Sequence, residues 1–143
     1  MSFLKKINPE WALRIGFGIM YLYSGSNLIR HPTAWHWAMP FWFKNLITSS
    51  ISLDAYLRFQ GIIEVFFAVV LLGWFFKTAI VKIVALLSAL EMAGILAFAF
   101  LPWSEANFLI TFRDIGLLAG AVALFILVSQ KNQLRGSPIV PNA

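Results

Sequence analysis

Four long apolar runs dominate this sequence, and each is long enough to cross a lipid bilayer as a helix. They cover about residues 11–29, 55–76, 79–101 and 108–128. A helix needs roughly 20 apolar residues to cross the hydrocarbon core, where backbone groups find no water to hydrogen-bond. The runs therefore predict an all-α membrane protein with four transmembrane helices in a single antiparallel bundle, formed by residues 1–143.

The composition supports this class of protein and excludes several others. Hydrophobic residues make up 60% of the chain and charged residues only 12%, whereas a soluble domain is about 25% charged. The absence of cysteine excludes thiolate nucleophiles and iron–sulfur clusters within this chain. The net charge of +5 comes from dispersed cations near the ends of apolar runs, which indicates lipid head groups as partners and argues against nucleic acid.

The breaks between the runs have their own signals. Pro32 ends the first run, because proline cannot extend a helix without losing a backbone hydrogen bond. The second and third runs are so close at Lys77 that they must form an antiparallel hairpin, and Pro102 turns the third into the fourth. Residues 130–143 are expected to form a flexible tail. Arg14 interrupts the first run, which favours a retained helix over a cleaved signal peptide.

The distribution of cations predicts the orientation in the membrane. With four spans, seven cations fall on the side of the termini and four on the opposite side. Positively charged flanks stay in the cytoplasm, so both termini should be cytoplasmic and residues 30–54 should form an outer loop. The seven are Lys5, Lys6, Arg14, Lys77, Lys82, Lys131 and Arg135, and the four are Arg30, Lys44, Arg58 and Arg113.

The outer loop is rich in aromatic residues, including Trp35, Trp37 and Trp42. Tryptophan prefers the membrane interface, where its ring is buried and its N–H stays hydrated. The loop could therefore be an interfacial anchor, or an aromatic roof over a site for an amphipathic ligand. We expect no metal site, since His31 and His36 do not share a helical face and have no third ligand nearby.

Ionisable residues inside the predicted spans are the best indication of a site. Each costs roughly 2.5–3.5 kcal/mol at mid-span and usually faces a protein interior. With a rise of about 1.5 Å per residue, polar groups from all four spans fall in the outer half of the membrane, and only Arg14 lies near the inner face. The candidates for ligand binding or proton handling are Ser24, Asn27, Arg58, Gln60, Glu64, Glu91, Arg113 and Asp114.

These groups allow two interpretations. Arg58 or Arg113 could neutralise a carboxylate and leave a polar pocket that opens outward, or Arg–carboxylate pairs could simply lock the helices together. Glu64 and Glu91 favour a functional role, since two carboxylates at mid-depth exceed what packing requires. The G-x-x-x-G formed by Gly116 and Gly120 is assigned to helix packing.

Several motifs together resemble the DoxX-like family of small four-helix membrane proteins. They are Arg14, Gly18, Ser24-Gly25, Arg30-His31-Pro32, Glu64, Gly73 and Arg113-Asp114, and the likeness spans about residues 10–128. The resemblance implies a protein of the bacterial or archaeal cytoplasmic membrane, in some members similar to subunits of thiosulfate:quinone oxidoreductase. Glu91 and the long aromatic loop depart from the family pattern.

The first functional hypothesis is an accessory subunit of a quinone-linked membrane redox complex, which binds a quinone-like or other amphipathic ligand in the outer half of the bilayer. The chain has no covalently bound cofactor in this hypothesis, so a partner would supply the redox centre. No nucleophile with an adjacent base is evident, and catalytic residues are not expected. The alternatives are a small proton-coupled transporter or channel, which could oligomerise, and a membrane scaffold without a ligand.

Overall fold

The computed structural model describes residues 8–101, 103 and 108–136, with only the backbone described for 108–113 and 132–136. Every regular element in this part of the chain is helical. The order along the chain is α1 (Pro9–Arg30), the 3₁₀-helix η2 (Pro32–Ala38), α2 (Phe41–Thr48), α3 (Leu53–Leu72), α4 (Thr78–Phe100) and α5 (Phe108–Gly136). The prediction of an all-α chain is confirmed for these residues.

Three of the long helices have the length and hydropathy needed to cross a membrane. They are α3, α4 and the Asp114–Lys131 part of α5, as judged on the described residues. Three of the four predicted spans are thus confirmed as long apolar helices, consistent with an integral membrane protein. Helix α1 has 22 residues but is not among them, so its role as a fourth span stays a prediction.

Local sequence signals determine where α1 and α3 begin. The Asn8 side chain accepts a hydrogen bond from the Glu10 backbone N–H, and Pro9 occupies the first helical position, where its missing N–H is not needed. In the same way, the Ser52 side chain accepts a hydrogen bond from the Ala55 N–H at the start of α3. Helix α1 ends at Arg30, two residues before Pro32, as the sequence predicted.

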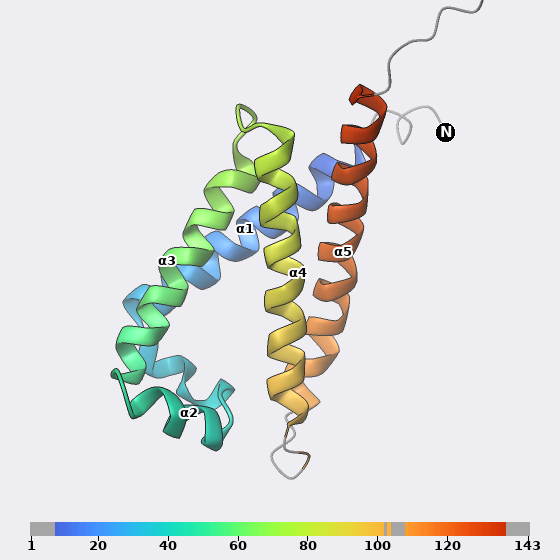
Figure 1. Cartoon of the computed structure of the whole chain (residues 1–143). Helices are drawn as coiled ribbons and strands as arrows, with labels where there is room; N and C mark the ends of the chain where they lie inside the picture. Colours follow the sequence, from blue (N-terminus) through green and yellow to red (C-terminus); the bar gives the residue numbers. More distant parts are fainter. Residues whose placement is uncertain (1–7, 102, 104–107, 137–143) are drawn as a thin grey trace, which may run out of the picture.

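The long helices pack as two pairs. The most extensive contacts are those of α1 with α3 and of α4 with α5, and α1 crosses behind the other helices at an angle (Figure 1). Glycines allow the closest approach in the first pair, because a Cβ atom on Gly25 would lie 2.7 Å from the Gly61 backbone oxygen. Helices α3 and α4 meet at their connecting turn and diverge away from it (Figure 1).

A buried apolar core holds the two pairs together near this turn. Phe17 and Tyr21 of α1 pack with Phe67 of α3, and Tyr21 meets Phe67 edge to face at a centroid distance of 5.5 Å. Val84 and Leu124 contribute from α4 and α5. Because the core fills only part of the length of the helices, their other end is free to enclose a cavity.

Several predicted boundaries were wrong. The second span ends at Leu72 and not at residue 76, since Gly73 caps the helix and its N–H bonds the Val69 oxygen. The chain from residue 130 is helical as far as Gly136, where a flexible tail was predicted, because Lys131 is tied to Glu10 by a 2.7 Å ion pair. Residues 137–143 lie outside the described part. The outer loop contains two helical elements, η2 and α2.

Of the two glycines predicted to mediate helix packing, Gly120 lies against another helix and Gly116 does not. A Cβ atom on Gly120 would lie 3.1 Å from the Phe17 ring, whereas one on Gly116 would meet nothing within 4 Å. Packing therefore explains Gly120 alone. Two other glycines, Gly25 of α1 and Gly61 of α3, lie directly against each other and let these two helices approach closely.

Candidate functional site

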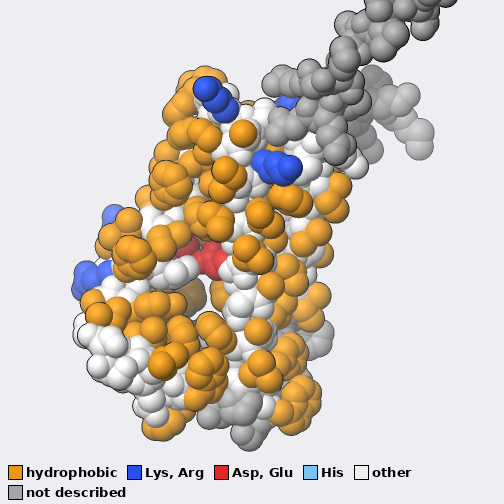
Figure 2. All heavy atoms as spheres, viewed as in Figure 1, with side chains coloured by type: hydrophobic (Ala, Val, Ile, Leu, Met, Phe, Trp, Pro, Cys, Tyr) orange, Lys and Arg blue, Asp and Glu red, His pale blue; other side chains and the backbone are white. Residues whose placement is uncertain are grey.

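A cavity of about 690 Å³ lies between the two helix pairs, at the end of the molecule that carries η2 and α2. Binding sites for small molecules have volumes of about 300–1,000 Å³ and mostly apolar walls, and this cavity fits both criteria. The cavity opens sideways: the face between α3 and α4 is hollowed, and acidic side chains are visible inside the hollow (Figure 2). The four long helices and the 35–43 segment all contribute lining residues.

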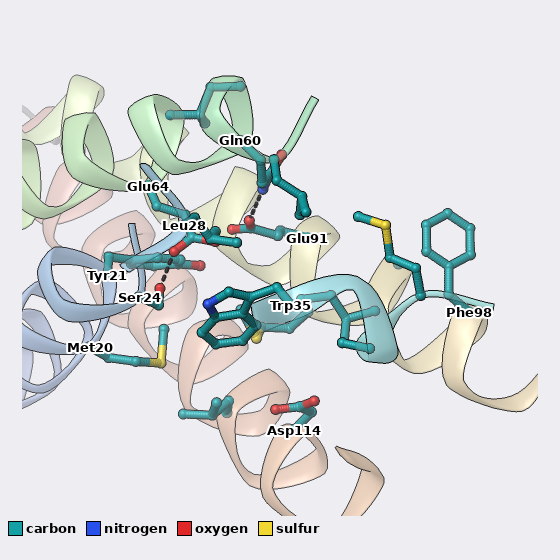
Figure 3. Close-up of a pocket in the computed structure, with 18 of the residues that line it drawn as sticks. Met20, Tyr21, Ser24, Leu28, Trp35, Gln60, Glu64, Glu91, Phe98 and Asp114 are labelled. Atoms are coloured by element: carbon teal, nitrogen blue, oxygen red, sulfur yellow. Dashed lines mark hydrogen bonds between the residues drawn. The ribbon is translucent and has the colours of Figure 1, made fainter. Parts of the chain in front are cut away.

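Glu64 lies on the α3 side of the cavity and is only 7% exposed. The Ser24 hydroxyl of α1 donates a hydrogen bond to Glu64 Oε2 (Figure 3). This contact is possible because Gly25, the next residue of α1, lies against Gly61 and brings the two backbones together. The sequence predicted both groups in the outer half of the membrane, and the structure brings their side chains into direct contact.

Glu91 approaches the same cavity from α4. The Gln60 side-chain amide donates a hydrogen bond to Glu91 Oε1, which links α3 to α4 (Figure 3). The second oxygen, Oε2, is buried and has no hydrogen-bond partner among the described residues. The hydroxyl of Tyr21, whose side chain is 1% exposed, interacts with the Glu91 carboxylate, although no hydrogen bond of good geometry joins them.

Trp35 covers the cavity from η2. Its Nε1 donates a 2.8 Å hydrogen bond to Asn27 Oδ1, which fixes the ring over the site. Asn27 itself does not line the cavity, so its contribution is to position Trp35. Trp37 lines the cavity as well, but Trp42 does not: its Nε1 donates to the Leu101 backbone oxygen at 2.8 Å, and its ring packs on Phe98. The predicted aromatic roof is therefore formed by two of its three tryptophans.

Arg58, one of the two arginines considered as partners for the carboxylates, bonds a backbone oxygen instead. Arg58 is exposed, and its Nη1 donates a 2.8 Å hydrogen bond to the Ile29 backbone oxygen at the end of α1. The prediction that Arg58 neutralises a carboxylate is thus wrong, because a free helix-end carbonyl is closer to its side chain. Asp114 lines the cavity from α5 and is 1% exposed, while the Arg113 side chain lies outside the described residues.

A second polar cluster, which the sequence did not predict, lies at the opposite end of α1. Arg14 donates from Nε to the Leu71 oxygen at 2.9 Å and from Nη2 to the Gly73 oxygen at 2.7 Å. Glu10 lies 3.4 Å from Arg14 and 2.7 Å from Lys131 of α5. The cluster ties three helices together through residues far apart in sequence. Its one local signal was the i, i+4 spacing of Glu10 and Arg14.

The two histidines do not form a metal site in the structure. His36 Nε2 lies 2.7 Å from Asp54 Oδ1, which fastens η2 to the start of α3. No group of three potential metal ligands is found among the residues that the structure describes.

Comparisons with known proteins do not identify the cavity. No protein-family model, no curated protein and no solved structure matches this chain. The chemistry of the site must therefore be argued from its own residues. Those residues form an apolar chamber with hydroxyl, amide and carboxylate groups on its α1, α3 and α4 walls, and such a chamber suits a molecule with both a polar and an apolar part.

Proposed function

We propose that this chain is an integral membrane protein that binds an amphipathic small molecule inside the bilayer, in the cavity between the α1–α3 and α4–α5 pairs. In this proposal α1 is the fourth span, both termini are cytoplasmic, and the cavity lies in the outer half of a bacterial or archaeal cytoplasmic membrane. The observation that carries the proposal is the cavity of about 690 Å³ with the carboxylates of Glu64 and Glu91 in its wall.

The position of the opening supports a ligand that partitions into lipid. The hollow faces sideways between α3 and α4, and both helices are apolar enough to cross a membrane (Figure 2). An opening at this place would face acyl chains, so a ligand could enter from the bilayer. The polar group of such a ligand would reach Glu64 and Glu91, while its apolar part would lie against residues such as Met20 and Phe98.

The resemblance to the DoxX-like family adds a specific version of this proposal. In that version the ligand is a quinol, whose hydroxyls can donate to carboxylate oxygens and whose ring can stack on Trp35. The chain would then be an accessory subunit of a redox complex, and a partner would carry the redox centre. Recovery of a quinone and a redox partner on purification in mild detergent would support this version, and recovery of neither would contradict it.

A cavity-filling substitution tests the binding site itself. Ile63 lines the cavity, whereas Ile62 is 58% exposed on the outside of α3. Ile63→Phe should lower the amount of small molecule that copurifies with the protein, measured by mass spectrometry of a lipid extract, and Ile62→Phe should not. Equal amounts in both variants and the wild type would contradict binding in this cavity.

Two carboxylates in one chamber favour a second function, proton-coupled transport of the ligand. In that case Glu64→Gln and Glu91→Gln should abolish ligand-dependent proton flux in proteoliposomes while ligand binding persists. A ligand-free scaffold makes a different prediction: Glu64→Gln would lower thermal stability, because it alters the Ser24 contact, and would change no other property.

A further inference from the structure

Two carboxylates in the wall of the cavity, Glu64 and Glu91, have no cation beside them among the described residues that line it. None of those lining residues is a lysine, arginine or histidine. Three cations of the long helices bond elsewhere: Arg58 donates to a backbone oxygen at the end of α1, and Arg14 and Lys131 belong to the cluster at the other end of that helix. Glu64 and Glu91 are held by neutral donors, Ser24 and Gln60.

The rest of the lining is unusually aromatic. Rings come from η2, from α2 and from three of the long helices, and Figure 3 shows Tyr21 and Trp35 near the carboxylates and Phe98 farther along the wall. An aromatic face carries negative electrostatic potential and attracts a cation, above all a quaternary ammonium enclosed by several rings. The rings are Tyr21, Tyr23, Trp35, Trp37, Phe43, Tyr56, Phe67 and Phe98.

Glu91 has a second neighbour in the wall, the Tyr21 hydroxyl, which interacts with the Glu91 carboxylate. Glu91 Oε2 and the Tyr21 hydroxyl are both buried, and no hydrogen bond of good geometry joins either atom to a described residue. The groups beside the Glu91 carboxylate are thus the neutral side chains of Gln60 and Tyr21. An ammonium group that reaches this carboxylate would supply the positive charge that the described wall lacks.

From this arrangement we infer that the preferred ligand of the cavity is a lipophilic cation: an ammonium group on an aromatic or alkyl body. The inference rests on the proposed function, which provides the cavity and its lateral opening, and it narrows the ligand class from any amphipathic molecule to one with a positive charge. The ammonium group lies between Glu64 and Glu91 beneath Trp35. The apolar body extends toward Phe43 and Phe98, where the wall has no charged group among the described side chains.

A pair of probes that differ only in charge tests the inference. The cation is 3-phenylpropyl-trimethylammonium, and its neutral isostere has a quaternary carbon in place of the nitrogen. Affinities are measured on the full chain in lipid nanodiscs, and empty nanodiscs correct for partition into lipid. A short-chain benzoquinol is the third probe. The cation should bind at least tenfold more tightly than the isostere.

Variants locate the origin of this preference. Glu64→Gln with Glu91→Gln should reduce the preference for the cation over the isostere to less than threefold, where the preference is the ratio of the two affinities measured on the same variant. Asp54→Asn is the matched control: it removes a carboxylate outside the cavity but keeps an acceptor for His36, and it should retain the full preference.

The outcomes separate the inference from the proposed function. Equal affinities for cation and isostere in the wild-type protein, or tighter binding of the quinol than of the cation, would overturn the cationic ligand and leave the binding cavity in place. Failure of all three probes to bind would count against both. Loss of the preference in Asp54→Asn would assign it to surface charge and overturn the inference. The wild-type comparison needs no variant, so it decides the question even if the double variant does not fold.

Discussion

Replacement of Arg14 by methionine tests whether the cluster at the end of α1 stabilises the fold. Arg14 is 5% exposed and donates to the oxygens of Leu71 and Gly73, at 2.9 and 2.7 Å. These carbonyls lie at the C-terminal end of α3, where they have no partner within their own helix. Its guanidinium carbon also lies 4.1 Å from the centre of the Trp11 ring. Methionine retains the apolar stem of the side chain and removes every one of these polar contacts.

The loss of unfolding free energy expected for Arg14→Met follows from the two short hydrogen bonds of the Arg14 side chain. A hydrogen bond to a charged group contributes about 1.5–3 kcal/mol, so the pair contributes about 3–6 kcal/mol. The variant also removes one of the two cations beside Glu10, which is itself 6% exposed, while Lys131 remains 2.7 Å away. A second estimate of the same loss comes from buried ion pairs, in which removal of one partner costs about 3–5 kcal/mol. Arg14→Met should therefore lower the free energy of unfolding by about 3–5 kcal/mol.

Unfolding by sodium dodecyl sulfate in mixed micelles, followed by circular dichroism, measures this loss. Arg58→Met is the matched control, because Arg58 also donates to a helix-end carbonyl but is exposed, and its loss should be below about 1.5 kcal/mol. The loss of unfolding free energy in Arg14→Lys should lie between those of the two methionine variants, since an ammonium keeps the charge but lacks the planar guanidinium that reaches two carbonyls. Equal losses in the two methionine variants would contradict a stabilising role for the cluster around Arg14.

Three further predictions concern packing, topology and pH. Gly25→Ala should cost about 1–3 kcal/mol in the same unfolding assay, because its Cβ would lie 2.7 Å from the Gly61 oxygen, whereas Gly16→Ala on the same helix has no neighbour within 4 Å and should change little. The chain has no cysteine, so single cysteines report topology directly: an impermeant maleimide should label Ser50→Cys in intact cells and Lys77→Cys only after permeabilisation, and the reverse pattern would invert the orientation. Protons and a cationic ligand should compete for the carboxylates of the cavity, so the affinity for the cation should fall as the pH falls. The fall should be up to about tenfold per pH unit if the cation displaces one proton. The affinity for the neutral isostere should stay constant. The facing ionisable groups in that competition are Tyr21, Tyr23, Tyr56, Glu64, Glu91 and Asp114.

The residue numbers placed polar groups of different spans in the same half of the membrane, because a helix converts residue number into distance at a fixed rise. Four of these groups line one cavity: Ser24 of α1, Gln60 and Glu64 of α3, and Glu91 of α4. Asp114 of α5 lies there as well. The strong hydropathy of α3, α4 and α5 was likewise sufficient to predict their approximate positions along the chain.

The partners of these groups could not be predicted in the same way. Depth says nothing about the direction in which a side chain points around its helix, so Arg58 was considered, beside Arg113, as a partner for a carboxylate, although it bonds the Ile29 oxygen. The Glu10–Lys131 contact joins residues 121 positions apart, and the second of them was expected to lie in a tail. Such contacts depend on the helix pairing, which a single sequence with four similar apolar runs leaves open.

The pairing also explains why α1 is the least apolar of the four long helices. Its polar side chains meet several different elements: Arg14 bonds the end of α3, Ser24 bonds Glu64, and Asn27 holds Trp35 of η2. Glu10 adds the contact with Lys131 of α5. A helix that connects so many elements through hydrogen bonds must carry polar residues, and these lower its hydropathy. Its weak apolar character therefore follows from its contacts, and if α1 is the fourth span, its partner helices must satisfy those polar groups within the membrane.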